Sequence, residues 1–318
     1  MNLKGLNNCK SIHKQGYFSR LRSDIMRDKY LYLLLLPVVI WYIMFSYKPM
    51  LGLEIAFRDY SPWMGIKDSP YVGLSNFINF FQGQYFWRTL KNTLVINFYA
   101  LIFGFPAPIV LALLLNEVRN KMFKNVVTTI VYLPHFISTV VIVGIVLSFL
   151  APGTGIINIL IRKLGGKDIY FIMQPEYFRT IFTTMNIWKE IGFGSIIYVS
   201  AFAGIDTQLY EACAIDGGGK WRQLWHITLP GIANTVIIML IMRIGTLLSV
   251  GYEAIILMYQ PVTYETADVI STYVYRIGIE GEQMSMATAV GLFNSVVSFI
   301  LVITTNYISK KFSEVSLW

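Results

Sequence analysis

Six apolar stretches constrain this chain more than any other feature, since each has close to the roughly 20 residues that an α-helix needs to cross a bilayer. They cover residues 30–47, 92–115, 126–150, 180–205, 232–250 and 284–308. The chain is 55% hydrophobic and 14% charged, whereas soluble domains carry about 25% charged residues. This composition disfavours a soluble enzyme and excludes an intrinsically disordered chain. The sequence predicts an all-α, polytopic membrane protein with six transmembrane helices.

The distribution of Lys and Arg predicts the orientation of these helices. The segments expected inside are 1–29, 116–125, 204–230 and 306–318, and those expected outside are 48–91, 151–179 and 251–283. The inner segments hold 14 Lys and Arg in 79 residues, and the outer segments 10 in 106. Because basic residues concentrate on the cytosolic side, both termini are expected in the cytosol. The net charge of +8 has the same explanation, so no nucleic-acid partner is expected.

Three regions follow from this topology. A basic cytosolic segment covers residues 1–29, a six-helix transmembrane domain covers 30–308, and a cytosolic tail covers 309–318. The first segment has no apolar core before a small-residue cleavage site, so an uncleaved first helix is expected rather than a signal peptide.

The predicted cytosolic loop 206–230 has the pattern of two short amphipathic helices. Apolar faces are formed by Leu209, Ala212 and Cys213 in the first helix and by Trp221, Leu224 and Trp225 in the second. Gly217, Gly218 and Gly219 separate them and permit a positive φ angle. From the residues alone, this loop either docks a cytosolic partner or is an amphipathic loop held by lipid headgroups.

The same loop resembles the signature of a known family. The residues Glu211-Ala212-Cys213, then Asp216-Gly217, then Leu229-Pro230 at the end of the loop, are similar to the EAA motif of membrane permeases in binding-protein-dependent ABC importers. Two positions depart from the pattern, because Cys213 replaces the second alanine and Gly218 stands where alanine is common. Both departures are small residues.

Further segments extend the resemblance to the polysaccharide- and oligosaccharide-permease branch of that family. They are Tyr47-Lys-Pro-Met-Leu-Gly, Ala56-Phe-Arg-Asp-Tyr60, Val72-Gly-Leu-Ser-Asn-Phe77, Leu113-Leu-Leu-Asn-Glu-Val118, Tyr132-Leu-Pro-His-Phe-Ile-Ser138 and Glu314-Val-Ser-Leu-Trp318. The resemblance implies a type I importer fold in the bacterial cytoplasmic membrane. It also implies an oligosaccharide substrate, a second homologous permease subunit, and a lipid-anchored or periplasmic solute-binding protein.

The family further implies that two separate ATPase subunits bind ATP and Mg²⁺, so that this chain holds no cofactor or metal and has no catalytic residue. The ATPase would be contacted by a coupling helix that carries Glu211, Ala212, Cys213, Asp216 and Gly217. Consistent with this, Gly217-Gly-Gly-Lys220 is not a phosphate-binding loop, because the required earlier Gly is absent and Trp221 stands where Ser or Thr is needed.

Charged residues within apolar spans are energetically costly and are therefore functional candidates. Asn186, Lys189 and Glu190 lie in the fourth stretch and Arg243 in the fifth, with Glu190 and Arg243 at comparable depth. They are candidates for a hydrated substrate pathway, where an Arg could also pair with the carboxylate of an acidic sugar. The alternatives are a salt bridge between Glu190 and Arg243 that only locks two helices, or a misplaced span boundary.

Other polar residues support weaker hypotheses. His135 fits a packed helix-end residue better than a ligand. Glu253, Glu265 and Asp268, in the predicted outer segment 251–283, either contact the binding protein or are solvated loop charges.

Three other functions compete with that of an oligosaccharide permease. The same architecture could carry another small polar solute. A membrane-embedded enzyme would need a nucleophile with a base, or clustered metal ligands, and the three histidines and two cysteines are too dispersed. A non-transporting receptor or scaffold leaves the EAA-like loop unexplained.

Overall fold

The computed structural model describes residues 26–248 and 250–313, which belong to two units, 1–54 and 55–318. The described part of the first unit is helical, with α2 (Lys29–Tyr42) and α3 (Lys48–Met50) joined by a π-helical turn. Most of the predicted basic segment 1–29, and the Glu314–Trp318 motif of the predicted tail, lie outside the described residues.

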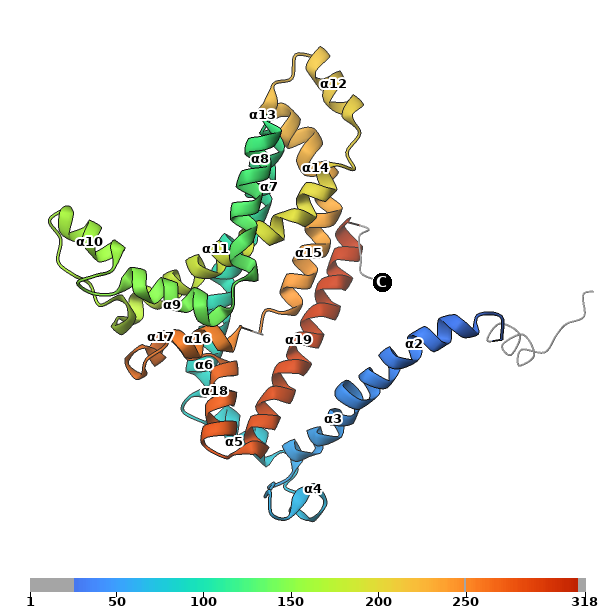
Figure 1. Cartoon of the computed structure of the whole chain (residues 1–318). Coiled ribbons are helices and arrows are strands. Elements are labelled where there is room, and N and C mark those ends of the chain that lie inside the picture. Colours follow the sequence, from blue (N-terminus) through green and yellow to red (C-terminus); the bar gives the residue numbers. More distant parts are fainter. Residues whose placement is uncertain (1–25, 249, 314–318) are drawn as a thin grey trace, which may run out of the picture. The chain divides into compact units, whose positions relative to one another are not determined.

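The second unit is built from helices (Figure 1). They are α4 (Gly65–Asp68), α5 (Ser75–Gln82), α6 (Phe86–Tyr99), α7 (Pro106–Glu117), α8 (Lys121–Tyr132), α9 (Thr139–Leu150), α10 (Ile156–Lys163), α11 (Pro175–Phe202), α12 (Thr207–Ile215), α13 (Lys220–Gln223), α14 (Leu229–Gly231), α15 (Ala233–Gly245), α16 (Tyr252–Met258), α17 (Tyr264–Ala267), α18 (Ile270–Tyr275) and α19 (Met284–Ser313). Within the described residues, the extended pairing amounts to one isolated bridge between Arg58 and Tyr71.

Three helical runs are long and apolar enough to cross a membrane: Lys29–Phe57, Phe86–Glu117 and Met284–Lys311. Two bent pairs raise the number to five if each pair counts as one span. Helix α11 has 28 residues, enough to span, but its polar and charged residues keep it outside this apolar set. The all-α membrane fold is therefore confirmed, while the count of six spans stays a prediction.

The predicted third span, 126–150, is broken rather than straight. A 3-10 turn at Leu133–Phe136 separates α8 from α9, and the two directions differ by 105°. Pro134 is the second residue of this turn, where its missing N–H is tolerated. Ser138 then starts α9, because its Oγ accepts a hydrogen bond from the backbone N–H of Val141 at 3.4 Å. Hydropathy alone did not reveal this corner.

Helix α11 organises the packing of the second unit. Its Phe178, Phe182 and Met185 join α9 and α16 in one buried cluster, while Tyr198 and Phe202 join α7 in another. A third cluster, centred on Phe80 and Val290, packs α5 and α18 against α19. The side chains of α11 therefore face several neighbours at once.

Close packing of α11 against α8 depends on Gly192, since a Cβ atom there would run into the backbone carbonyl of Val131. We expect Gly192→Ala to destabilise the protein by about 1–3 kcal/mol, the usual effect of overpacking. Gly144→Ala, in α9, is the matched control because nothing lies within 4 Å of the added Cβ. Thermal melting of the purified transporter checks this, and equal melting temperatures for the two variants would contradict it.

Candidate functional site

The 206–230 loop folds into the two short helices that its sequence predicts. Asp206 begins α12, with its Oδ1 accepting a hydrogen bond from the N–H of Gln208 at 2.9 Å. The turn after α12 requires a left-handed residue, and Gly217 supplies it with φ +76°. Helices α12 and α13 lie together at one end of the second unit (Figure 1). The loop is thus a defined helical element rather than an irregular connection.

The EAA-like residues lie on an accessible surface of this element. Glu211, Ala212, Asp216 and Gly217 are exposed and Cys213 is half-buried. Large apolar side chains are exposed beside them, with Ile215 at 86% and Trp221 at 75%. Apolar side chains left open in this way are typical of a surface that another protein or a membrane covers.

The loop is tied to its surroundings by a few polar contacts. The hydroxyl groups of Tyr210 and Thr228 lie 3.0 Å apart and join the first helix to the base of the second. Lys220 forms a 3.0 Å ion pair with Glu117 at the end of α7.

The two departures from the EAA pattern are spatial neighbours. A Cβ atom at position 218 would meet both the Sγ and the carbonyl oxygen of Cys213. Cys213, which is larger than the alanine of the family pattern, therefore occurs together with Gly218, which lacks the side chain of the alanine common at that position.

A cavity of about 600 Å³ lies between α6, α7, α11 and α15. We call it the central cavity. Its polar lining includes Asn97, Thr183, Asn186, Glu190 and Arg243, and the rest is mostly aliphatic and aromatic. Pockets of this volume with few polar groups are typical of small-molecule sites.

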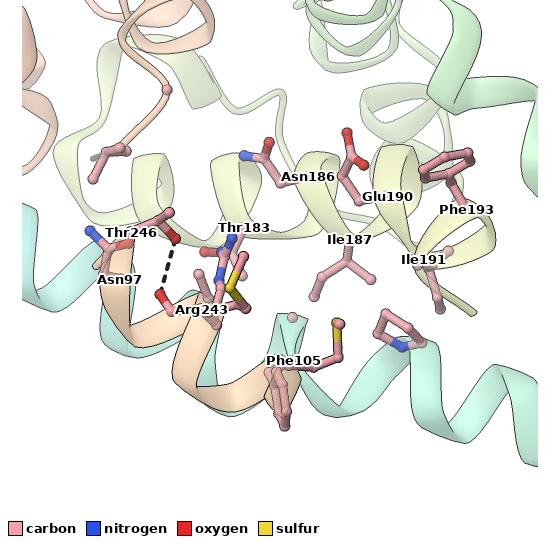
Figure 2. Close-up of a pocket in the computed structure, with 18 of the residues that line it drawn as sticks. Asn97, Phe105, Thr183, Asn186, Ile187, Glu190, Ile191, Phe193, Arg243 and Thr246 are labelled. Atoms are coloured by element: carbon pink, nitrogen blue, oxygen red, sulfur yellow. Dashed lines mark hydrogen bonds between the residues drawn. The ribbon is translucent and has the colours of Figure 1, made fainter. Parts of the chain in front are cut away.

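Three of the four predicted pathway residues line the central cavity. Asn186 and Glu190 lie one turn apart on the same side of α11, and Arg243 comes from α15 (Figure 2). Lys189 is not part of the lining. It turns toward α9, where its Nζ donates to Thr139 Oγ1 at 3.0 Å.

Glu190 is paired with His135, not with Arg243. Its Oε2 lies 2.9 Å from Nδ1 of His135, and the imidazole stacks on Phe193 with ring centroids 3.9 Å apart. His135 therefore packs at the corner between α8 and α9, in line with its reading as a helix-end residue. No ion pair joins Glu190 to Arg243, and the Arg243 side chain makes no hydrogen bond to the rest of the described chain. The helix-locking pair considered from the sequence is not formed.

A buried charge cluster lies toward the end of the second unit that is opposite α12 and α13. The sequence predicts a solvated loop there. Asp268 is 0% exposed. Its carboxylate accepts from Arg88 Nη2 at 2.8 Å and from Arg276 at 3.0 and 2.7 Å, and Thr272 Oγ1 donates to it at 3.0 Å. The expectation that Asp268 is a solvated charge or contacts a binding protein is therefore wrong. Its apolar neighbours, Ala267 and Val269, were the one local signal of burial.

Asn92 extends this cluster across three helices. Its Nδ2 donates to the carbonyls of Glu265 at 2.9 Å and Asp268 at 3.0 Å, and its Oδ1 accepts from Arg179 Nη2 at 2.9 Å. The network joins α6 and α11 to α17 and to Asp268, the residue that follows it. None of these partners is adjacent in sequence, so no motif announced it.

Comparison with known proteins decides the family. Residues 104–314 match the family described as "binding-protein-dependent transport system inner membrane component". The chain belongs to this family. It is a multi-pass permease component of a bacterial importer, and its helical fold and location in a bacterial membrane agree with the sequence prediction.

Relatives match over almost the whole chain. Protein LplB of Bacillus subtilis (strain 168) is 46% identical, covering 93% of each chain. The polygalacturonan/rhamnogalacturonan transport system permease protein YteP of the same strain is 44% identical, covering 96% of each chain. A solved bacterial alginate ABC transporter, in complex with an alginate pentasaccharide-bound periplasmic protein, has a chain that is 47% identical with a TM-score of 0.87, covering 94% of this chain and all of that one.

Proposed function

We propose that this chain is one of two permease subunits of an importer for acidic oligosaccharides. A solute-binding protein delivers the sugar, and separate ATPase subunits supply the energy. The observation that carries this proposal is the central cavity, whose lining includes the Asn186 amide, the Glu190 carboxylate and the Arg243 guanidinium, and Arg243 donates no side-chain hydrogen bond to the described residues. Such groups suit sugar hydroxyls and a sugar carboxylate.

The relatives support the same class of substrate. One relative is named for polygalacturonan and rhamnogalacturonan, polymers that contain uronic acids, and the solved transporter imports the acidic polysaccharide alginate. In this permease, Arg243 would meet the carboxylate of a sugar unit. Asn186 would donate to and accept from its hydroxyls, while Glu190, oriented by His135, would accept hydrogen bonds from them.

The exposed face of α12 supports the proposal that ATP hydrolysis takes place elsewhere. Glu211 offers a carboxylate to a basic residue of an ATPase subunit, and the open apolar side chains next to it provide area to bury. The two permease subunits and two ATPase subunits would thus be linked through this loop. One test is ATPase activity in proteoliposomes, which should rise when binding protein loaded with an acidic oligosaccharide is added outside. No response to loaded binding protein would contradict the proposal.

Arg243→Gln should reduce uptake of an acidic oligosaccharide about 10- to 100-fold, since a hydrogen bond to a charged group contributes about 1.5–3 kcal/mol. Lys189→Gln is the control, because Lys189 carries the same charge as Arg243 but lies outside the cavity lining. Uptake of labelled oligosaccharide by vesicles with matched amounts of assembled transporter measures both. A larger loss in Lys189→Gln than in Arg243→Gln would contradict the pathway assignment.

A further inference from the structure

A second cavity, of about 390 Å³, lies apart from the central cavity. It is formed where α6 begins, along α17 and α18, and at the start of α19. We call it the tyrosine–arginine cavity after its main lining residues, which are Tyr85, Arg88, Tyr264, Tyr273, Arg276 and Gln283. Helices α18 and α5 mark this end of the unit in Figure 1, opposite α12 and α13. With α12 on the cytosolic side, this cavity lies at the end of the unit nearer the side from which a binding protein delivers substrate.

The charges of this cavity are not balanced. Two guanidinium groups, those of Arg88 and Arg276, share the single carboxylate of Asp268. The other carboxylates of the segment, Glu265, Glu280 and Glu282, are exposed and do not belong to the lining. One positive charge is therefore left over in a partly enclosed space, where an additional anion gains more than it would in bulk water.

Arg88 also keeps donors that no group of the described chain uses. Arg88 gives one N–H to Asp268, while its Nε is buried without a partner and its Nη1 bonds to no described residue. Burial disfavours the charged form of Arg276, but its bonds to Asp268 outweigh this effect, so that its pKa lies above the usual value. The Arg276 guanidinium is thus a fixed cation at neutral pH.

Aromatic rings hold these cations and shape the cavity. The Arg88 guanidinium lies 4.7 Å from the Tyr85 ring centroid, and that of Arg276 lies 4.8 Å from the Tyr264 ring centroid. Cation–π contacts fix the guanidinium planes, and ring faces with phenol and amide groups nearby suit the apolar faces and hydroxyls of a sugar. The volume of the tyrosine–arginine cavity lies within the range of small-ligand sites.

We infer that the tyrosine–arginine cavity binds the carboxylate of a uronic-acid unit, taking up an acidic oligosaccharide before it reaches the central cavity. Asp268 orients the two arginines, and the substrate supplies the second anion. Tyr85 and Gln283, which make no bond to Asp268, contact the sugar ring. This inference rests on the proposed function, and it adds a second, entry-side subsite that selects for negative charge.

The test introduces a carboxylate at the rim. Gln283 is an exposed residue of the lining, and Gln283→Glu hardly changes the size of its side chain. The substitution leaves the bonds to Asp268 intact, but the new carboxylate cancels the excess positive charge. Gln174→Glu makes the same change on an exposed residue outside the lining. Both are placed in an Arg243→Gln background of the complete transporter, which removes the arginine of the central cavity. Binding of a galacturonate trisaccharide and of its methyl ester is then measured by saturation-transfer NMR without binding protein.

The acid should bind at least tenfold more tightly than the ester, and Gln283→Glu should weaken acid binding about tenfold while leaving ester binding and the Gln174→Glu control unchanged. Equal binding of acid and ester, no detectable acid binding, or no effect of Gln283→Glu would each overturn the inference. Uptake assays on transporters that keep Arg243 separate this inference from the proposed function. If the transporter imports acidic oligosaccharide and Gln283→Glu has no effect, only the proposed binding site in this cavity is refuted. If the transporter binds the acid at this cavity but imports no oligosaccharide, only the proposed function is refuted.

Discussion

Gly217→Val should abolish uptake while the transporter still inserts into the membrane and assembles. Gly217 has φ +76° at the end of α12, and a β-branched residue there costs on the order of 1–3 kcal/mol. No atom lies within 4 Å of an added Cβ, so the effect is conformational rather than steric. The variant would redirect the chain between α12 and α13 and displace the surface that carries Glu211, which is the proposed contact with the ATPase.

Gly219→Val is the matched control for this variant. Gly219 has φ −77° and ψ 178°, an extended conformation that valine adopts readily, and it too has open space around its Cβ position. Uptake per assembled transporter, normalised to membrane-inserted protein, compares the two. Equal uptake by both variants would show that the turn at Gly217 does not transmit the effect of ATP hydrolysis.

The second large effect is expected for Asp268→Asn. The carboxylate is fully buried and accepts hydrogen bonds from two arginines and Thr272. Loss of one partner from a buried charge cluster typically costs 3–5 kcal/mol, because the remaining charges are left without compensation. The variant should accumulate poorly, and its melting temperature should fall by on the order of 10 °C.

The neighbouring residue Glu265 provides the comparison for Asp268. Glu265→Gln removes a carboxylate three positions away that is exposed, and surface substitutions of this kind usually change stability by less than about 0.5 kcal/mol. Fluorescence-detected size exclusion after heating measures both variants in detergent. If Asp268→Asn and Glu265→Gln have the same melting temperature, the cluster does not hold α6 to the segment between α17 and α18.

The 206–230 loop shows what the sequence could predict. Its turn depends on Gly217 and its first helix on Asp206, so the information is local and the structure reproduces it. The broken third span shows the opposite case. Residues 126–150 have the length and composition of one apolar span, and the direction of the chain after Pro134 depends on how α8 and α9 pack against α11.

The polar residues of the fourth stretch show a second limit. Lys189 and Glu190 are adjacent in sequence, but successive helical residues point about 100° apart. Glu190 therefore lines the central cavity and Lys189 reaches Thr139 on α9. Asp268 and Arg88 are 180 positions apart, and a single sequence carries no signal that pairs them. The roles of these residues in transport stay predictions.

Uptake of a labelled galacturonate oligosaccharide by proteoliposomes tests the proposed function most directly. The vesicles hold this chain with its partner permease and ATPase subunits, with ATP inside and the solute-binding protein outside. We expect accumulation that requires both ATP and the binding protein and that is strongly reduced for a neutral oligosaccharide of the same length. Equal accumulation of the neutral sugar, or accumulation without the binding protein or without ATP, would contradict an importer for acidic oligosaccharides.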